Sequence, residues 1–274
     1  MRNLTTTKEN SWCPGCGNFG IFNAVKKSIE SLVEMGEPME NIVMSSGIGC
    51  HGKMFDYLNI SGIFGLHGRA MAGASGIKIA NPNLKVIVFG GDGDSMGEGL
   101  EHTLFAAKRN IDLTMILHNN GVYGLTTGQA SPLSLTGYRG LSTPQGNLET
   151  PFHTLGLIME AGASFVARAY SARIPQLSEL ITQAVLHKGF SFIEVLQPCV
   201  SYNNTYDLYN SKTKNLAGIP ASDEEAIKLA KDENDIYLGV FRQEQRPVFD
   251  QEVQSKARAM DRQERFAYLE SRQF

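Results

Sequence analysis

Short apolar segments alternate with helix-like segments over the first 200 residues, and this alternation restricts the chain to a small set of folds. Near-continuous apolar runs rich in β-branched residues are typical of strands buried on both faces of a parallel sheet. Such strands alternate with helices in doubly wound α/β folds. We therefore expect strands in five segments: 42–46, 84–90, 113–119, 164–169 and 190–196.

The segments between these strands have helical patterns. Apolar residues recur every three or four positions in residues 19–33, as a helix with one buried face requires. Small side chains dominate residues 68–80, which suits a helix packed closely against a sheet, and two further helices are expected at 97–110 and 174–189. Residues 60–65 are either a short strand or a loop. The sequence predicts an α/β fold with a doubly wound parallel sheet and no internal repeat.

The character of the sequence changes after residue 200, so we divide the chain into a core, residues 1–200, and a C-terminal extension, residues 201–274. The extension begins with a polar and aromatic stretch without clear period and contains two predicted helices, 222–231 and 251–271. We expect it to wrap over the core or a partner subunit. A disordered tail is the alternative, although four apolar residues favour packing: Tyr237, Leu238, Val240 and Phe241.

Composition restricts the possible partners. The chain has 274 residues, 42% of them apolar and 19% charged, and a formal net charge of −3. This balance gives no electrostatic reason to expect nucleic acid or an anionic membrane as partner. No apolar run approaches the roughly 20 residues that a membrane-spanning helix needs, and the opening MRNLTTTKEN lacks the apolar core of a signal peptide. We therefore expect a cytoplasmic protein.

A glycine-rich segment with two aspartates, GGDGD at 90–94, follows one predicted strand. Glycine lets the backbone approach a phosphate group closely. Because the carboxylate of Asp92 would repel a bare phosphate, its position requires a cation such as Mg²⁺. Asn120 follows the next strand, about 28 residues later, and adjacent parallel strands end at the same edge of a sheet. These residues predict a magnesium and diphosphate site; an ordinary turn at GDG is the alternative.

Four cysteines occur in the chain, at positions 13, 16, 50 and 199. Cys13 and Cys16 form a CxxC motif, whereas Cys50 and Cys199 each follow a predicted strand. Four thiolates complete the ligand set of a tetrahedral zinc ion or of an iron–sulfur cluster. The alternative is one redox or structural CxxC pair with two unrelated buried thiols.

The segment GDG, followed about 28 residues later by NN, resembles the thiamine-diphosphate motif of thiamine-dependent enzymes. A wider set of segments resembles the β subunit of the 2-oxoacid:ferredoxin oxidoreductases, from residue 11 to about residue 200: WCPGCGNFGI, GIGCHGK, LHGRAMAGASGIKIANP, GGDGDSMGEG and NNGVYGLTTGQASP. This resemblance implies a thiamine-diphosphate-binding fold. It also implies that Asp92, the Asn120 side chain and the Val122 carbonyl bind Mg²⁺, and that a [4Fe–4S] cluster is held by Cys13, Cys16, Cys50 and Cys199.

The resemblance implies a reaction and a set of partners. The family converts a 2-oxoacid, coenzyme A and oxidised ferredoxin to acyl-coenzyme A, CO₂ and reduced ferredoxin. The HGR and YGLTTGQ segments are most similar to 2-oxoglutarate-type members. In this family the glutamate that activates thiamine comes from another subunit. The chain is therefore expected to be inactive without an α or fused γα partner.

Specific roles follow from the resemblance. His67 is the candidate for polarising or protonating the substrate carbonyl oxygen, with a structural or phosphate-contacting role as alternative. Lys53 is the candidate partner of a substrate carboxylate, with a solvated surface lysine as alternative. Relatives often carry lysine where this chain has Thr127, so coenzyme A is expected to bind differently here.

The other histidines at 102, 118, 153 and 187 are interpreted as structural. The expected cofactor-lining residues are Ile48, Gly49, Cys50, His51, Leu66, His67, Gly68, Arg69, Gly93, Asp94, Gly124 and Leu125.

Two other functions remain compatible with these motifs. One is a non-redox thiamine-dependent decarboxylase or synthase whose cysteines bind zinc or nothing. The other is a non-catalytic partner subunit that keeps the fold without the chemistry. Zinc accepts four thiolates but carries no electrons, whereas electrons released by oxidative decarboxylation must leave one at a time. This requirement favours iron.

Overall fold

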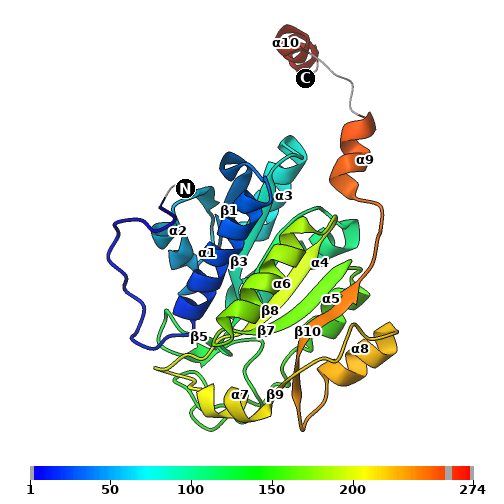
Figure 1. Ribbon diagram of the computed structural model, residues 1–274. Helices are drawn as coiled ribbons and strands as arrows, with labels where there is room; N and C mark the ends of the chain where they lie inside the picture. Colours follow the sequence, from blue (N-terminus) through cyan, green and yellow to red (C-terminus); the bar gives the residue numbers. More distant parts are fainter. Residues whose placement is uncertain (1–2, 257–260, 272–274) are drawn as a thin grey trace.

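A mostly parallel sheet organises the protein, as the computed structural model of residues 3–256 and 261–271 shows (Figure 1). Its eight strands have the order β2-β1-β3-β4-β8-β7-β10-β9. The six strands from β2 to β7 are parallel, and β10 is antiparallel to β7. The strand bounds are β1 Ile42–Ser46, β2 Ser61–Phe64, β3 Lys85–Gly91, β4 Thr114–Asn119, β7 Phe165–Tyr170, β8 Ser191–Leu196, β9 Thr213–Asn215 and β10 Ile236–Gln243.

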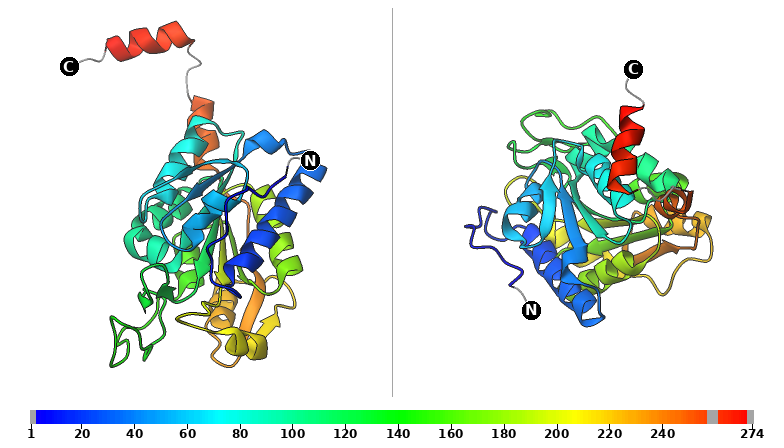
Figure 2. Two further views of the ribbon diagram at one scale, coloured as in Figure 1. Left: turned by 90° about the vertical axis from the view of Figure 1, so that its left-hand side faces the viewer. Right: turned by 90° about the horizontal axis from the view of Figure 1, so that it is seen from above.

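Helices cover both faces of this sheet (Figures 1 and 2). Helices α1 and α6 pack together on one face, and α3, α4 and α5 lie on the other. Two separate apolar cores result, one on each face, which confirms the predicted doubly wound α/β fold. The helix bounds are α1 Asn18–Glu34, α2 Met54–Tyr57, α3 Ala70–Ala80, α4 Leu100–Arg109, α5 Thr154–Glu160, α6 Ile174–Leu186, α7 Tyr206–Lys212, α8 Asp223–Ala230, α9 Phe249–Lys256 and α10 Arg262–Glu270.

The apolar pattern of the sequence explains this burial. In α1, the side chains of Ile21, Val25 and Ile29 are fully buried at a spacing of four residues, so one face of the helix meets the sheet. All six residues of β8 are buried, as expected for a strand covered on both faces. Most side chains in the middle of the sheet are apolar and buried, so open ligand-binding space is expected at the ends of its strands.

The C-terminal extension contributes to the same sheet. Strand β10 pairs with β7, and its residues Leu238 and Phe241 are buried. The polar stretch 201–215, which shows no period in the sequence, contains α7 and β9. The single helix predicted at 251–271 is instead divided into α9 and α10, and its residues 257–260 lie outside the described part of the chain. Contact between the extension and a partner subunit stays a prediction.

Two local features near the strand ends bear on the sequence-based expectations, one by deciding between alternatives and one by correcting a helix boundary. Residues 61–64 form β2, a strand at one edge of the sheet, so 60–65 includes a strand. The helix predicted from residue 97 begins only at Leu100, because a wide helical turn occupies Asp94–Glu98. Turns of this kind occur frequently at functional sites.

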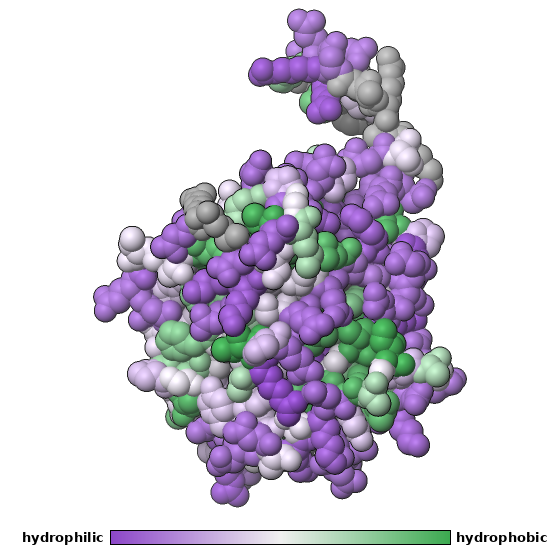
Figure 3. Space-filling model, in the orientation of Figure 1, coloured by the Kyte–Doolittle hydropathy of each residue, from purple (hydrophilic) through white to green (hydrophobic). Residues whose placement is uncertain are grey.

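The surface of the molecule is mostly hydrophilic on the side seen in Figure 3, with separate hydrophobic patches between the polar areas. The described part of α10 is exposed along its whole length. Among the described residues, no helix combines the length and apolar character needed to cross a membrane.

Candidate functional site

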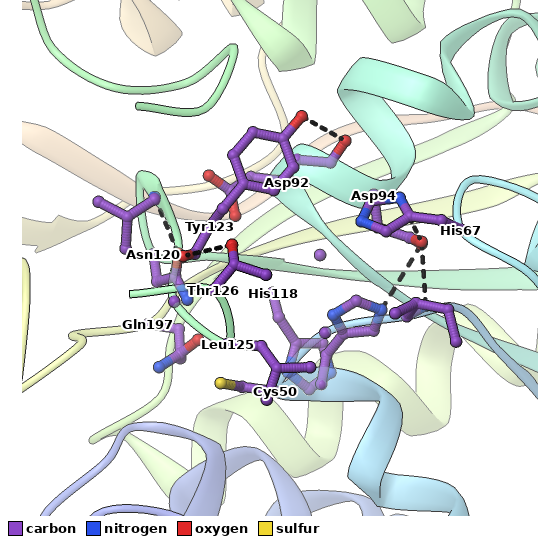
Figure 4. Close-up of a pocket in the computed structure, with 17 residues that line it drawn as sticks. Cys50, His67, Asp92, Asp94, His118, Asn120, Tyr123, Leu125, Thr126 and Gln197 are labelled. Atoms are coloured by element: carbon purple, nitrogen blue, oxygen red, sulfur yellow. Dashed lines mark hydrogen bonds and ion pairs between the residues drawn. The ribbon is translucent and has the colours of Figure 1, made fainter. Parts of the chain in front are cut away.

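The loops that follow β1, β3 and β4 meet at one edge of the sheet and enclose a pocket, which we call the carboxylate pocket (Figure 4). The carboxyl ends of parallel strands are the usual ligand-binding edge of this fold class. Most residues expected to bind the cofactor or Mg²⁺ line this pocket: Ile48, Gly49, Cys50, His51, His67, Asp92, Gly93, Asp94, Asn120, Val122, Gly124 and Leu125. Most of the predicted site residues thus lie together around one pocket, and their contact with a cofactor stays a prediction.

Three residues of the expected cofactor set lie outside the pocket lining. The Leu66 side chain is 77% exposed. The Gly68 N–H donates to Asp94 Oδ1 at 2.7 Å. This glycine therefore helps to hold Asp94, a residue that lines the pocket, in place. The Arg69 guanidinium donates to the carbonyl oxygens of Glu98 and Gly68, which holds two loops together. Their direct contact with a cofactor stays a prediction.

Asp92 is a buried carboxylate without a cationic partner in the described chain. Its side chain is 2% exposed and accepts a hydrogen bond from the Ser131 hydroxyl. Burial raises the pKa of Asp92 to about 7, although hydrogen bonds from Ser131 and nearby backbone groups oppose the shift. Asn120 Oδ1 accepts a hydrogen bond from the Val122 N–H at 2.9 Å, which orients the amide. Buried carboxylate and amide oxygens fit a hard cation such as Mg²⁺.

Asp94, in the segment after β3, connects the segments that follow β1 and β2. Its Oδ1 atom accepts hydrogen bonds from the backbone N–H groups of Ile48, at 3.0 Å, and Gly68. Its Oδ2 atom lies 3.5 Å from His51 Nε2. A Cβ on Gly47 would lie 2.1 Å from Oδ2, so only glycine fits there. Burial alone would raise the pKa of Asp94, but the His51 imidazole and the backbone donors lower it below its usual value.

His67 and Tyr123 face each other across one side of the pocket (Figure 4). His67 Nδ1 lies 3.4 Å from Asp94 Oδ1 and 3.2 Å from Glu98 Oε2. The Tyr123 hydroxyl lies 3.3 Å from both Glu98 carboxylate oxygens. Burial and the Glu98 charge raise the pKa of Tyr123, so the hydroxyl stays protonated and donates. The motifs assigned no role to Tyr123, although it stands within the NNGVYG segment.

His118, which is interpreted from the sequence as structural, also lines the carboxylate pocket. Its Nδ1 atom lies 2.8 Å from Asn18 Oδ1, so Nδ1 carries the proton and donates. Its Nε2 atom is buried and has no hydrogen-bond partner. Burial, together with the nearby His51, lowers the pKa of His118 well below its usual value. His118 therefore presents a neutral imidazole to the pocket wall.

All four cysteines line a second space, of about 190 Å³, which we call the thiol pocket. It shares five lining residues with the carboxylate pocket: Cys50, Asn120, Gly124, Leu125 and Gln197. A Cβ on Gly124 would lie 3.7 Å from the sulfur atoms of both Cys50 and Cys199. The structure thus brings the distant CxxC pair, Cys50 and Cys199 together beside the carboxylate pocket.

The thiols surround a space and do not converge on one point. Within the described ranges, no group of three or more His, Cys, Asp or Glu side chains is arranged to hold a single metal ion. Burial and the charges of the neighbouring cysteines raise the pKa values of Cys16 and Cys50 to about 11. Thiols that discourage one another's ionisation are poor nucleophiles, whereas a bound metal centre deprotonates them. The donor set therefore fits a sulfur-ligated metal centre.

Lys53 lines the thiol pocket and not the carboxylate pocket. Its ammonium group donates to Ser11 Oγ at 2.6 Å, and its charge favours the thiolate of Cys50. The predicted contact of Lys53 with a substrate carboxylate stays a prediction.

Comparison with known proteins identifies the family. Residues 47–195 match the thiamine pyrophosphate enzyme C-terminal TPP binding domain, and residues 199–257 match the C-terminal region of the pyruvate ferredoxin oxidoreductase beta subunit. A 2-oxoacid:ferredoxin oxidoreductase subunit beta from a Sulfolobus species is 43% identical in an alignment that covers 93% of this chain and 88% of that protein. The chain belongs to this beta-subunit family. The predicted family and its thiamine-diphosphate-binding fold are confirmed.

Further relatives agree with this assignment of the beta subunit. The 2-oxoglutarate synthase subunit KorB from Methanothermobacter thermautotrophicus is 36% identical over 91% of this chain and 90% of that protein. A solved 2-oxoglutarate:ferredoxin oxidoreductase from Magnetococcus marinus, with 2-oxoglutarate, coenzyme A and succinyl-CoA bound, superposes with a TM-score of 0.89 at 31% identity. The superposition covers 97% of this chain and 94% of the other.

Proposed function

We propose that this beta subunit takes part in coenzyme A-dependent oxidative decarboxylation of a 2-oxoacid, with 2-oxoglutarate as the preferred substrate. The carboxylate pocket would hold Mg²⁺ and thiamine diphosphate, and the four cysteines of the thiol pocket would hold a [4Fe–4S] cluster, which would supply one-electron transfer toward ferredoxin. Thiamine diphosphate supplies the electron sink for cleavage of the bond to the departing CO₂. The observation that carries this proposal is the wall shared by the two pockets at Gly124.

The roles of individual residues follow from their positions. Asp92, the Asn120 amide and the Val122 carbonyl hold Mg²⁺, while Asp94 fixes the surrounding loops. His67, which lies between Asp94 and Glu98, faces the pocket and is suited to exchange a proton with the substrate carbonyl oxygen. Cys13, Cys16, Cys50 and Cys199 hold the cluster.

The site is shared with a partner subunit in this proposal. The carboxylate pocket measures about 70 Å³, whereas pockets that enclose a whole drug-sized ligand measure roughly 300–1,000 Å³. No glutamate lines it in the described chain, although thiamine activation requires a carboxylate against the aminopyrimidine ring. Both observations support an α or fused γα partner that supplies the other half. The extension after residue 200 is a further candidate for contact with that partner.

The substrate proposal is supported by the names of relatives. The Magnetococcus enzyme contains 2-oxoglutarate, coenzyme A and succinyl-CoA, and the Methanothermobacter relative is a 2-oxoglutarate synthase subunit. Thr127, where relatives often carry lysine, is exposed and has a left-handed backbone, and coenzyme A is expected to contact other groups of the site. A reaction that delivers electrons to ferredoxin and uses coenzyme A suits the cytoplasm.

Anaerobic co-purification with the partner subunit tests this proposal. We expect viologen dye reduction with coenzyme A to be faster with 2-oxoglutarate than with pyruvate, and to be lost in Asp92→Ala. Iron and acid-labile sulfide should be present in the wild type and reduced in Cys199→Ser. A colourless complex that contains zinc, or one that decarboxylates 2-oxoacids without dye reduction, would support the non-redox alternative.

A further inference from the structure

A buried glutamine lies between the two pockets. Gln197 follows β8, is 1% exposed and lines both the carboxylate pocket and the thiol pocket. Figure 4 labels it on the same side of the carboxylate pocket as Cys50 and Asn120. Its backbone N–H donates to Asn119 O at 2.8 Å, and a Cβ on Gly17 would lie 2.9 Å from its Cγ atom. The Gln197 side chain is therefore packed directly against the Gly17 backbone.

The contacts of Gln197 fix the orientation of its amide. The Nε2 atom lies 3.0 Å from Pro198 O and 3.5 Å from Cys16 Sγ. A carbonyl oxygen only accepts hydrogen bonds, so the amide atom that faces Pro198 must be the nitrogen. Its second N–H is then available to the Cys16 sulfur. The Oε1 atom is buried and has no hydrogen-bond partner.

A second donor contacts the same pair of cysteines. Ser201 Oγ lies 3.2 Å from Cys13 Sγ, at an exposed position. In the described chain, no side-chain donor contacts the sulfur of Cys50 or Cys199. The two side-chain donors are therefore at the CxxC motif, and both come from the segment that carries Cys199. Backbone N–H groups also contribute, at Cys16 from Asn18 and at Cys50 from its own residue.

We propose that Gln197, with a smaller contribution from Ser201, raises the reduction potential of the iron–sulfur cluster by donating hydrogen bonds to Cys16 and Cys13. This inference rests on the proposed function, because it requires a cluster in the thiol pocket. Reduction adds negative charge to the cluster and its thiolates, and hydrogen bonds to the sulfurs stabilise that charge. The effect is larger at the buried Gln197, because water competes with Ser201 at the surface.

Redox titration of the assembled complex, followed by electron paramagnetic resonance, tests the inference. The signal that belongs to this cluster is the one that disappears in Cys199→Ser. Gln197→Met keeps the approximate size of the side chain and removes the hydrogen-bond donor. The reduction potential of the cluster in this variant should therefore shift to a more negative value. Gln197→Glu adds a negative charge as well and should shift it further. For one electron, a potential change of about 59 mV corresponds to a tenfold change in the reduction equilibrium.

Ser201→Ala provides an independent measurement at an exposed position, and it should produce a smaller shift in the same direction. Ser201→Thr, which keeps the hydroxyl, is the matched control and should retain the wild-type potential. An unchanged or more positive cluster potential in Gln197→Met overturns the inference. If the Gln197→Met complex does not assemble, an unchanged cluster potential in Ser201→Ala overturns it instead. Absence of iron and of the signal from the wild-type complex would instead overturn the proposed function.

Discussion

Two buried carboxylates in this protein have opposite surroundings. Glu194, on β8, accepts hydrogen bonds from Asn119 and Thr154 and pairs with Arg168 at 2.7 Å. Asp92, after β3, has a hydroxyl partner but no cationic partner in the described chain. Despite burial, the Arg168 charge and these donors lower the pKa of Glu194, whereas burial raises the pKa of Asp92 to about 7.

We interpret the difference as one between a structural charge and a carboxylate that we propose as a magnesium ligand. The charge of Glu194 is balanced within the chain, so it needs nothing from outside. The charge of Asp92 is not balanced in this way, and it lies at the strand edge where ligands bind in this fold class. An unbalanced buried carboxylate at that edge indicates a place for a cation from solution.

Removal of Arg168 should have the largest effect. Arg168→Met leaves Glu194 buried without its cationic partner, so the free energy of unfolding should fall by roughly 3–5 kcal/mol. Chemical denaturation measures this change. Lys214→Met is the control, because it breaks an exposed ion pair with Asp235 and should leave stability unchanged. Similar stabilities for the two variants would contradict the interpretation of Glu194 and Arg168 as a structural pair.

Asp92→Asn should have the opposite effect on the metal-free protein. The substitution removes a charge that burial disfavours, so the unliganded subunit should be as stable as the wild type or more stable. The affinity of the assembled complex for thiamine diphosphate in the presence of magnesium should fall by about 100-fold or more. Loss of a residue that only hydrogen-bonds to a metal ligand typically lowers affinity by roughly 10–100-fold, and loss of a direct ligand should lower it at least as much. Isothermal titration calorimetry measures this affinity. Wild-type affinity in the variant would exclude Asp92 as a magnesium ligand.

The two carboxylates should also respond to pH with opposite sign. Between about pH 4 and pH 7, the raised pKa of Asp92 keeps a proton on the folded chain that the unfolded chain has lost. The stability that this proton contributes is therefore present at low pH and disappears as the pH rises from about 4 to about 7. The lowered pKa of Glu194 gives a contribution that is present at neutral pH and lost as the pH falls below the ordinary pKa of 4.5. Denaturation of metal-free wild type, Asp92→Asn and Glu194→Gln across this range measures both contributions; slopes of equal sign would contradict the comparison.

A smaller effect is expected at the wall shared by the two pockets. A Cβ on Gly124 would be in ordinary contact with the free thiols of Cys50 and Cys199, but it would occupy space needed by a cluster between them. Gly124→Ala should therefore fold normally and incorporate less iron. Gly76→Ala, on α3 with no atom within 4 Å of the added Cβ, is the matched control and should keep its full iron content. Equal iron content in both variants would place the cluster away from Gly124.

The core of the fold could be predicted from the sequence because the information there is local. Each central strand is an apolar run of ordinary strand length, and glycine, aspartate and asparagine mark the strand ends that form the carboxylate pocket. Strand β10 was not predicted as part of the sheet, because its antiparallel pairing with β7 depends on a contact between distant segments. The wide turn before α4 was missed because helical periodicity alone does not distinguish it from an ordinary first turn.

The parts of the site that sequence analysis missed depend on side-chain orientation. His118 lies within an apolar strand, and only its contact with Asn18 shows which ring nitrogen is left without a partner. Gln197 stands two positions before Cys199, which is a local signal of proximity to the thiols, but its contact with Cys16 joins residues 181 positions apart. Lys53 is close to Cys50 in the sequence, and this proximity places it among the thiols.

Reduction of the cluster by substrate tests the functional link between the two pockets most directly. The anaerobic complex, mixed with 2-oxoglutarate and coenzyme A without ferredoxin, should develop the electron paramagnetic resonance signal of a reduced cluster within one turnover. That signal should be absent in Cys199→Ser and in Asp92→Ala. An iron-containing wild-type complex that releases CO₂ while this cluster stays oxidised would contradict electron transfer from the carboxylate pocket to the thiol pocket.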